Sequence, residues 1–253
     1  MTSDAIYNII LIAWLVLSLL IFTSLLFIVA PYGRHVKSGW GPALDSKLGW
    51  VAMEAASPVI FAACFILGKA PLSIPSVIFL LMWEAHYIHR AFIYPSSLKS
   101  SHDKMPLSIA FSGIFFNLMN AWLNGYYIFT LSGGYPDQWL LDPRFMAGAA
   151  LFVAGFVINR QADDTLAKLR KPGETGYKIP RGGLYNLVSC PNYFGEIMIW
   201  TGWALATWSL AGLSFALWTV ANLAPRAMSH HTWYHENFPD YPPGRKVLIP
   251  GIW

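Results

Sequence analysis

Long apolar runs alternate with short polar segments along nearly the whole chain. At about 1.5 Å per residue, a helix over residues 5–30 is long enough to cross a bilayer core of about 30 Å. This first run lacks the basic start of a signal peptide, so we interpret it as a retained helix. Six further membrane helices are expected at about residues 48–67, 74–94, 106–131, 145–164, 192–208 and 213–228.

The distribution of positive charge predicts the orientation of these helices. All of the 17 Lys and Arg residues except Lys69 and Arg144 lie on the side of the odd-numbered loops and the C-terminal tail. Such loops are cytoplasmic in most membrane proteins. We therefore predict an all-α membrane protein: a seven-transmembrane helix bundle with the N-terminus outside and the C-terminus in the cytoplasm. Residues 1–253 are expected to form one integral-membrane domain, whose C-terminal part covers about residues 106–253.

Composition agrees with a membrane protein and excludes several other classes. The chain is 55% hydrophobic and 12% charged, with a net charge of +4, which is too apolar for an ordinary soluble domain. Its two cysteines, Cys64 and Cys190, suggest neither a disulfide framework nor a metal site. No nucleic-acid motif is present. The expected partners are the bilayer and an apolar small molecule, and we expect a monomer.

Acidic side chains inside predicted helices point to a site, because a buried carboxyl in a bilayer is costly. Glu54 lies about 9 Å past the cytoplasmic start of the second helix, and Tyr87 about 10 Å before the cytoplasmic end of the third. The two side chains are therefore expected at the same depth. A carboxyl beside a phenol in an apolar pocket suits a carbonyl oxygen that gains negative charge. The simpler alternative is a buried Glu satisfied by a neighbouring helix; for Glu84, support of Tyr87 or another partner both stay open.

A second group of polar residues recurs at i, i+4 spacing near the cytoplasmic ends of the last three helices. The pairs are Asn159 with Asp163, Asn192 with Glu196, and His230 with Tyr234, with Arg226 one turn before His230. Together with the loop cations Arg170, Lys171 and Arg181 they would form a cup open to the cytosol. Amides and carboxylates suit ribose hydroxyls, and arginine suits phosphates. Separate helix caps and interfacial residues are the alternative interpretation.

The usual nucleotide-binding loops are absent, since neither G-x-G-x-x-G after a strand nor a Walker A string occurs. A nucleotide would have to be held by the helices themselves. The longest polar interruption, LRKPGETGYKIPRGGLYNLVSCPNYFGE from Leu169, lies beside this cup.

Several strings together resemble the steroid 5α-reductase family. They are MEAASP around Glu54, HYIHRAFIYP from His86, NGYY from Asn124, YPDQW from Tyr135, the long loop, RAMSHHTWYHENFPDYP and RKVLIPGIW. The resemblance covers nearly all of the chain after the first helix.

The resemblance implies an NADPH-dependent membrane reductase that saturates the Δ4 double bond of 3-ketosteroids such as testosterone and progesterone. Hydride would go to C5, while Glu54 and Tyr87, the catalytic pair, polarise the 3-keto oxygen. Residues that would line the cofactor are Asn159, Asp163, Arg170, Tyr177, Asn192, Glu196, Arg226, His230 and Tyr234, with Tyr94 and Asn120 as lesser members. No metal is implied.

Some positions depart from the family pattern and leave alternatives open. Glu84 stands where an apolar or thiol residue is usual, and Pro191 stands where a small residue is usual. Another conjugated enone, enoyl lipid or polyprenol is an alternative substrate. An isoprenylcysteine-type methyltransferase is a more distant alternative, because its Arg-His pair is replaced here by Ser189 and Cys190. A transporter would show inverted repeats, which are absent. A bacterial inner membrane and the endoplasmic reticulum both fit.

Overall fold

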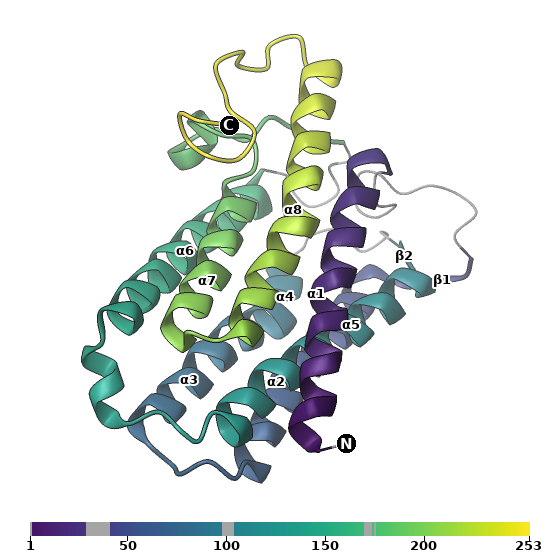
Figure 1. Cartoon of the computed structure of the whole chain (residues 1–253). Helices are drawn as coiled ribbons and strands as arrows, with labels where there is room; N and C mark the ends of the chain where they lie inside the picture. The colour runs from purple at the N-terminus through teal and green to yellow at the C-terminus, as the bar shows by residue number, and fades with distance from the viewer. Residues whose placement is uncertain (1, 29–40, 98–103, 170–173, 175) are drawn as a thin grey trace. The chain divides into compact units, whose positions relative to one another are not determined.

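The computed structural model describes residues 2–28, 41–97, 104–169, 174 and 176–253. The chain divides into two compact units. The first contains residues 1–11 and 31–145, and the second contains residues 12–30 and 146–253. The helix α1 (Ser3–Phe27) contributes to both (Figure 1).

A helix forms within each of the seven predicted apolar runs. After α1 these are α2 (Ser46–Leu67), α3 (Ile74–Ile88), α5 (Leu107–Tyr126), α6 (Pro143–Lys168), α7 (Pro191–Thr207) and α8 (Leu210–Asn237). Within the described residues, α1, α2 and α6 are long and apolar enough to cross a membrane. The protein is thus a largely helical membrane protein, and the count of seven spans and their orientation stay predictions.

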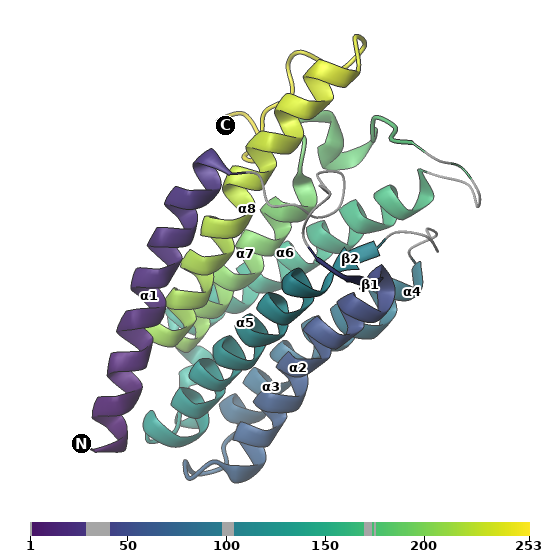
Figure 2. The ribbon, with the colours of Figure 1, turned by 90° about the vertical axis from the view of Figure 1, so that its right-hand side faces the viewer.

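Short elements interrupt or join these helices. The α3 helix continues through the π-helical turn η2 (His89–Ile93) into α4 (Tyr94–Ser97), and α5 ends in a second π-helical turn, η3 (Tyr127–Leu131). Two 3₁₀ turns follow, η4 (Asp137–Leu141) and η5 (Gly183–Asn186). An antiparallel pair, β1 (Ala43–Asp45) and β2 (Lys104–Pro106), was not predicted (Figure 2). Three-residue strands are too short to show an alternating pattern.

In the first unit, α2 packs against both α3 and α5 (Figure 2). The indole of Trp83 on α3 donates from Nε1 to Ser57 Oγ on α2 at 3.1 Å, and its ring stacks on Phe61 with centroids 4.3 Å apart. Pro58 stands inside α2. Because proline has no N–H, the carbonyl of Glu54 loses its helical donor at this point.

In the second unit, α7 and α8 form a tight hairpin. Trp208 adopts a left-handed conformation with φ of 45°, and Ser209 caps α8 by accepting from the Gly212 N–H. Two helices were predicted here, at about residues 192–208 and 213–228, but α8 continues to Asn237. Hydropathy falls where the side chains become polar, and a helix can continue past that point. His230 and Tyr234 therefore lie on α8 itself.

Candidate active site

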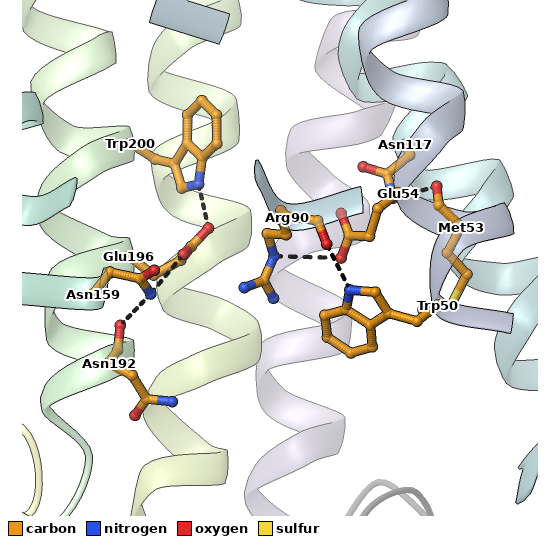
Figure 3. A network of polar contacts seen from close by, with 9 residues as sticks. All are labelled: Trp50, Met53, Glu54, Arg90, Asn117, Asn159, Asn192, Glu196 and Trp200. Carbon is orange, nitrogen blue, oxygen red and sulfur yellow. Dashed lines mark hydrogen bonds and ion pairs between the residues drawn. The ribbon is translucent and has the colours of Figure 1, made fainter. Parts of the chain in front are cut away.

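Glu54 is buried on α2 and is paired with a cation from the neighbouring π-helical turn. The Arg90 Nε atom lies 3.4 Å from Glu54 Oε1. The Arg90 guanidinium also lies 5.0 Å from the centroid of the Trp50 ring, while Trp50 Nε1 donates to the Arg90 carbonyl at 3.0 Å (Figure 3). The sequence predicted apolar surroundings for Glu54 and did not identify this partner. A π-helical turn inserts an extra residue, so the helical period read from the sequence does not hold through His89–Ile93.

A buried asparagine on α5 holds the backbone beside Glu54. Asn117 Nδ2 donates to the carbonyl of Met53 at 2.9 Å (Figure 3). Only 5% of Asn117 is exposed. The bond lies next to the part of α2 where Pro58 removes a helical donor, so Asn117 braces a weakened stretch of helix. Sequence reasoning did not identify Asn117, because its target is a backbone carbonyl more than sixty positions away.

Tyr87 is also buried in the first unit, on α3. Its ring lies 5.2 Å from the Trp83 ring and 5.1 Å from the His86 ring, measured between centroids. Ser57 is one turn after Glu54, and Trp83 is one turn before Tyr87. The helices α2 and α3 run in opposite directions (Figure 2). Glu54 and Tyr87 therefore each lie one helical turn from the Ser57–Trp83 bond, in the same direction along the two helices.

The two lesser cofactor residues of the prediction also belong to the first unit. Tyr94 on α4 is half-buried, with its ring centroid 5.6 Å from that of Trp50. Asn120 on α5 is fully buried, and Asn124 Nδ2 donates to its carbonyl at 3.0 Å. Glu84 is half-buried on α3, and its Oε1 atom has no hydrogen-bond partner in the described part of the chain.

The second unit brings four predicted cofactor residues into one network. Asn159 Nδ2 on α6 donates to the Asn192 carbonyl at 3.0 Å and to Glu196 Oε2 at 3.1 Å on α7 (Figure 3). Trp200 Nε1 donates to the other carboxylate oxygen of Glu196 at 2.9 Å. Asn192 Nδ2 in turn lies 3.3 Å from Asp163 Oδ1. The predicted i, i+4 pairs therefore face each other across two helices.

Close helix packing makes this network possible. A Cβ atom added at Gly155 on α6 would lie 2.6 Å from the Gly195 carbonyl oxygen on α7, and one added at Gly195 would lie 2.6 Å from the Asn159 backbone nitrogen. Small residues at helix contacts let the backbones approach closely. The short side chain of Asn159 can therefore reach the α7 backbone.

Arg226 and His230, on α8, meet around a residue that sequence reasoning missed. Tyr193 OH accepts a hydrogen bond of 2.9 Å from Arg226 Nε and lies 3.1 Å from His230 Nε2. Tyr193 follows Asn192 directly, so on a helix it faces a different neighbour. Its place in the CPNYFGE string was the one available signal.

The remaining predicted residues contact the C-terminal segment or lie outside the described residues. The ring of Tyr234 stacks on Tyr241 with centroids 5.0 Å apart and an interplanar angle of 7°. Tyr177 is 42% exposed, with its ring centroid 5.1 Å from that of Trp233. Arg170 lies outside the described residues. In the described part of the chain, no group of three or more His, Cys, Asp or Glu side chains is arranged to hold a metal ion.

The hydroxyl of Ser189, in the loop before α7, contacts both α8 and the C-terminal segment. Ser189 Oγ lies 2.6 Å from His231 Nδ1 and 2.7 Å from Tyr241 OH, and Val188 forms a parallel bridge with Lys246. Burial, followed by the nearby His235, lowers the pKa of His231 below its ordinary value. The imidazole is thereby kept neutral, which lets Nδ1 accept from the serine.

The phenol of Tyr185 is buried against α6. Its hydroxyl lies 3.5 Å from the carbonyl oxygen of Ala162. Burial, followed by the charge of Asp163, raises the pKa of Tyr185 well above its ordinary value. Tyr185 is therefore a neutral donor that fixes η5 beside the network on α6.

Comparison with known proteins identifies the family of the chain. Residues 103–253 match the family model described as 3-oxo-5-alpha-steroid 4-dehydrogenase. The chain belongs to this family. It is 41% identical to a steroid 5-alpha-reductase DET2 of Gossypium hirsutum, with 100% of both chains covered. It is 40% identical to 3-oxo-5-alpha-steroid 4-dehydrogenase 1 of Bos taurus, with 92% of each chain covered. The human protein of the same name is 42% identical, over 87% of this chain and 85% of its own.

Membership in the 3-oxo-5-alpha-steroid 4-dehydrogenase family makes the protein an oxidoreductase. The family model spans the networks on α6, α7 and α8, whereas Glu54 and Tyr87 precede residue 103. The match to the relative from Gossypium hirsutum covers the whole chain, so the compared region includes both of these positions. The family favours reduction over the methyltransferase and transporter alternatives.

Proposed function

We propose that this protein uses NADPH to reduce the Δ4 double bond of 3-ketosteroids to 5α-dihydrosteroids. The observation that carries the proposal is the buried carboxyl–arginine pair, Glu54 with Arg90, one helical turn from the bond that joins α2 to the helix bearing Tyr87. A buried acid and phenol on neighbouring helices suit a ketone oxygen that becomes an enolate. The relatives are named steroid 5-alpha-reductase and 3-oxo-5-alpha-steroid 4-dehydrogenase, and these names indicate the class of substrate.

The residues of the second unit fit a dinucleotide. Asn159, Asn192, Asp163 and Glu196 offer amide donors and carboxylate acceptors, which suit a carboxamide and ribose hydroxyls. Arg226 adds a charge-assisted donor and His230 a polar ring, and both are held through Tyr193. Bound NADPH supplies the hydride that goes to C5. The chain's own part is to hold the cofactor's amide and ribose through α6 and α7.

At the ketone end, Tyr87 donates a hydrogen bond from its hydroxyl to the 3-keto oxygen. Glu54 and Arg90 complete the surroundings of that oxygen. A lone carboxylate would repel the enolate that develops there, and the Arg90 guanidinium at 3.4 Å offsets this repulsion. The Tyr87 hydroxyl and the Arg90 guanidinium stabilise negative charge that exists only after hydride attack. They therefore lower the barrier instead of only tightening substrate binding. A proton then reaches C4 from solvent.

The substrate is tested with purified full-length protein in detergent. Testosterone, progesterone, androstenedione and a polyprenal-type enone are each added with NADPH, and loss of the reduced nicotinamide absorbance is followed together with the products. We expect turnover of the 3-ketosteroids to 5α products. Turnover of the polyprenal alone would shift the proposal to another conjugated enone, and no oxidation of NADPH by any enone would overturn it.

A further inference from the structure

Arg245 is a buried cation in the segment after α8. It is 4% exposed, its Nη2 donates to the Pro180 carbonyl at 2.9 Å, and its guanidinium carbon lies 5.0 Å from the Tyr241 ring centroid. Among the described residues, Nε and Nη1 have no hydrogen-bond partner, and Arg245 is paired with no carboxylate. Two donor nitrogens of a buried guanidinium are thus unused.

The surroundings of Arg245 do not fully compensate its buried charge. A buried charge is normally paired and fully hydrogen-bonded, because removal from water is costly. The Pro180 carbonyl and the Tyr241 ring offer only partial negative charge. An arginine cannot lose its proton to escape the cost. An anion with oxygens for Nε and Nη1 would complete the hydrogen bonding of this guanidinium.

The neighbouring cations show that Arg245 is the exception in this region. Lys178 Nζ is paired with Glu174, at 2.6 Å from Oε2, and Arg181 Nη2 lies 3.4 Å from Asp240 Oδ2. Both of these cations are exposed and have carboxylate partners. Arg245, by contrast, is buried one residue from Lys246, whose backbone N–H donates to the Leu187 carbonyl at 2.8 Å.

The position of Arg245 connects it to the predicted cofactor residues. The Tyr241 ring that faces the guanidinium stacks flat on Tyr234 of α8. The Pro180 carbonyl belongs to the loop that carries Tyr177. A guanidinium presents parallel donors that match a phosphate group. Ketosteroids carry no anionic group, whereas a dinucleotide carries a diphosphate and NADPH also a 2′-phosphate.

We propose that Arg245 binds a phosphate group of the dinucleotide through Nε and Nη1, while Nη2 stays on Pro180. The inference rests on the proposed use of NADPH. It assigns the C-terminal segment a direct part in cofactor binding, in addition to the polar networks of α6, α7 and α8.

The test measures dissociation constants of NADPH and NADH by calorimetry, and melting temperatures with and without pyrophosphate, for the full chain in detergent. Arg245→Met removes the donors with little change in length, and Arg245→Lys keeps the charge without the planar pair of donors. Lys246→Met, at the exposed next position, is the matched control. We expect Arg245→Met to weaken NADPH binding about 10- to 100-fold. The affinity of Arg245→Lys should lie between those of Arg245→Met and the unaltered protein, and Lys246→Met should bind like the unaltered protein.

The comparison of ligands identifies the phosphate. A larger loss for NADPH than for NADH assigns Arg245 to the 2′-phosphate. Equal losses, with the melting shift by pyrophosphate also lost, assign it to the diphosphate. Unchanged dissociation constants with a lower melting temperature, or equal losses with the pyrophosphate shift retained, would overturn the inference.

Failure of the proposed function has a different signature. In that case the unaltered protein binds neither dinucleotide. Protection by pyrophosphate that is lost in Arg245→Met would then still support an anion site at Arg245, and protection by pyrophosphate in neither protein would reject it.

Discussion

The Trp83 indole donates a 3.1 Å hydrogen bond to Ser57 Oγ, which ties α3 to α2 one turn from both Tyr87 and Glu54. The bond is buried, and the Trp83 ring also stacks on Phe61. Replacing Trp83 would therefore disturb two helices at once. The relationship gives Glu54 and Tyr87 a common support.

Tyr87→Phe should lower kcat by about 100- to 1,000-fold, as loss of one donor to a developing oxyanion does. Glu54→Gln should also lower kcat strongly, because it removes the carboxylate that holds the Arg90 guanidinium in place. Each change keeps the shape of the side chain. NADPH affinity should persist, because the proposed cofactor networks are on α6, α7 and α8. Steady-state kinetics with a 3-ketosteroid, together with NADPH titration, provide the measurement. Near-normal kcat in both variants would remove the proposed mechanism.

Arg90 and Glu54 should act as one unit. A double-mutant cycle with Glu54→Gln and Arg90→Met is expected to be non-additive in kcat/KM, because residues in contact typically couple by about 0.5–3 kcal/mol. The four proteins are compared with one steroid under the same conditions. Fully additive losses would show that the 3.4 Å ion pair has no part in the chemistry.

Asn159→Leu should weaken NADPH binding about 10- to 100-fold, because Asn159 orients the Glu196 carboxylate and the Asn192 carbonyl. The exposed Asn222 on α8 supplies the matched control, Asn222→Leu. Calorimetric titration measures both variants. Equal dissociation constants in the two variants would contradict the role of the α6–α7 network.

Gly155→Ala should destabilise the second unit by about 1–3 kcal/mol, the usual cost of overpacking a tight contact. The added methyl would lie 2.6 Å from the Gly195 carbonyl and 2.7 Å from the Ile199 nitrogen. Gly244→Ala is the control, since its Cβ would meet nothing within 4 Å. The melting temperatures of Gly155→Ala and Gly244→Ala are compared in detergent. Equal values would show that α6 and α7 can move apart without loss of stability.

The Ser189–His231 bond should make stability fall in mild acid. The pKa of His231 is lowered by burial and then by His235, so the unfolded chain takes up a proton at higher pH than the folded protein. Stability is therefore full above about pH 6.5, the ordinary histidine pKa, and is lost as the pH falls below it. Melting temperatures between about pH 5 and 8 are compared for the unaltered protein and His231→Gln. The variant should show a smaller decline, and identical declines would assign the pH effect to other groups.

The apolar runs predicted every long helix, because the bilayer and the helical rise set the length of such runs. The i, i+4 spacing also predicted the polar pairs that meet in the second unit, Asn159 with Asp163 and Asn192 with Glu196. These features depend on neighbours along the chain, which the sequence displays directly. Roles for Glu54, Tyr87 and the cofactor residues came from the family resemblance and stay predictions.

The tertiary structure decided which distant residues meet. Arg90 reaches Glu54 from a π-helical turn, Tyr193 contacts both Arg226 and His230, and Arg245 is buried although it lies in the C-terminal tail. No local period encodes these contacts, because they arise only when helices pack and the C-terminal segment folds back on the loop before α7. Sequence by itself determined the helices and the faces they present. Packing determined the partners of each face, because contact energies between distant segments are absent from any short window of the chain.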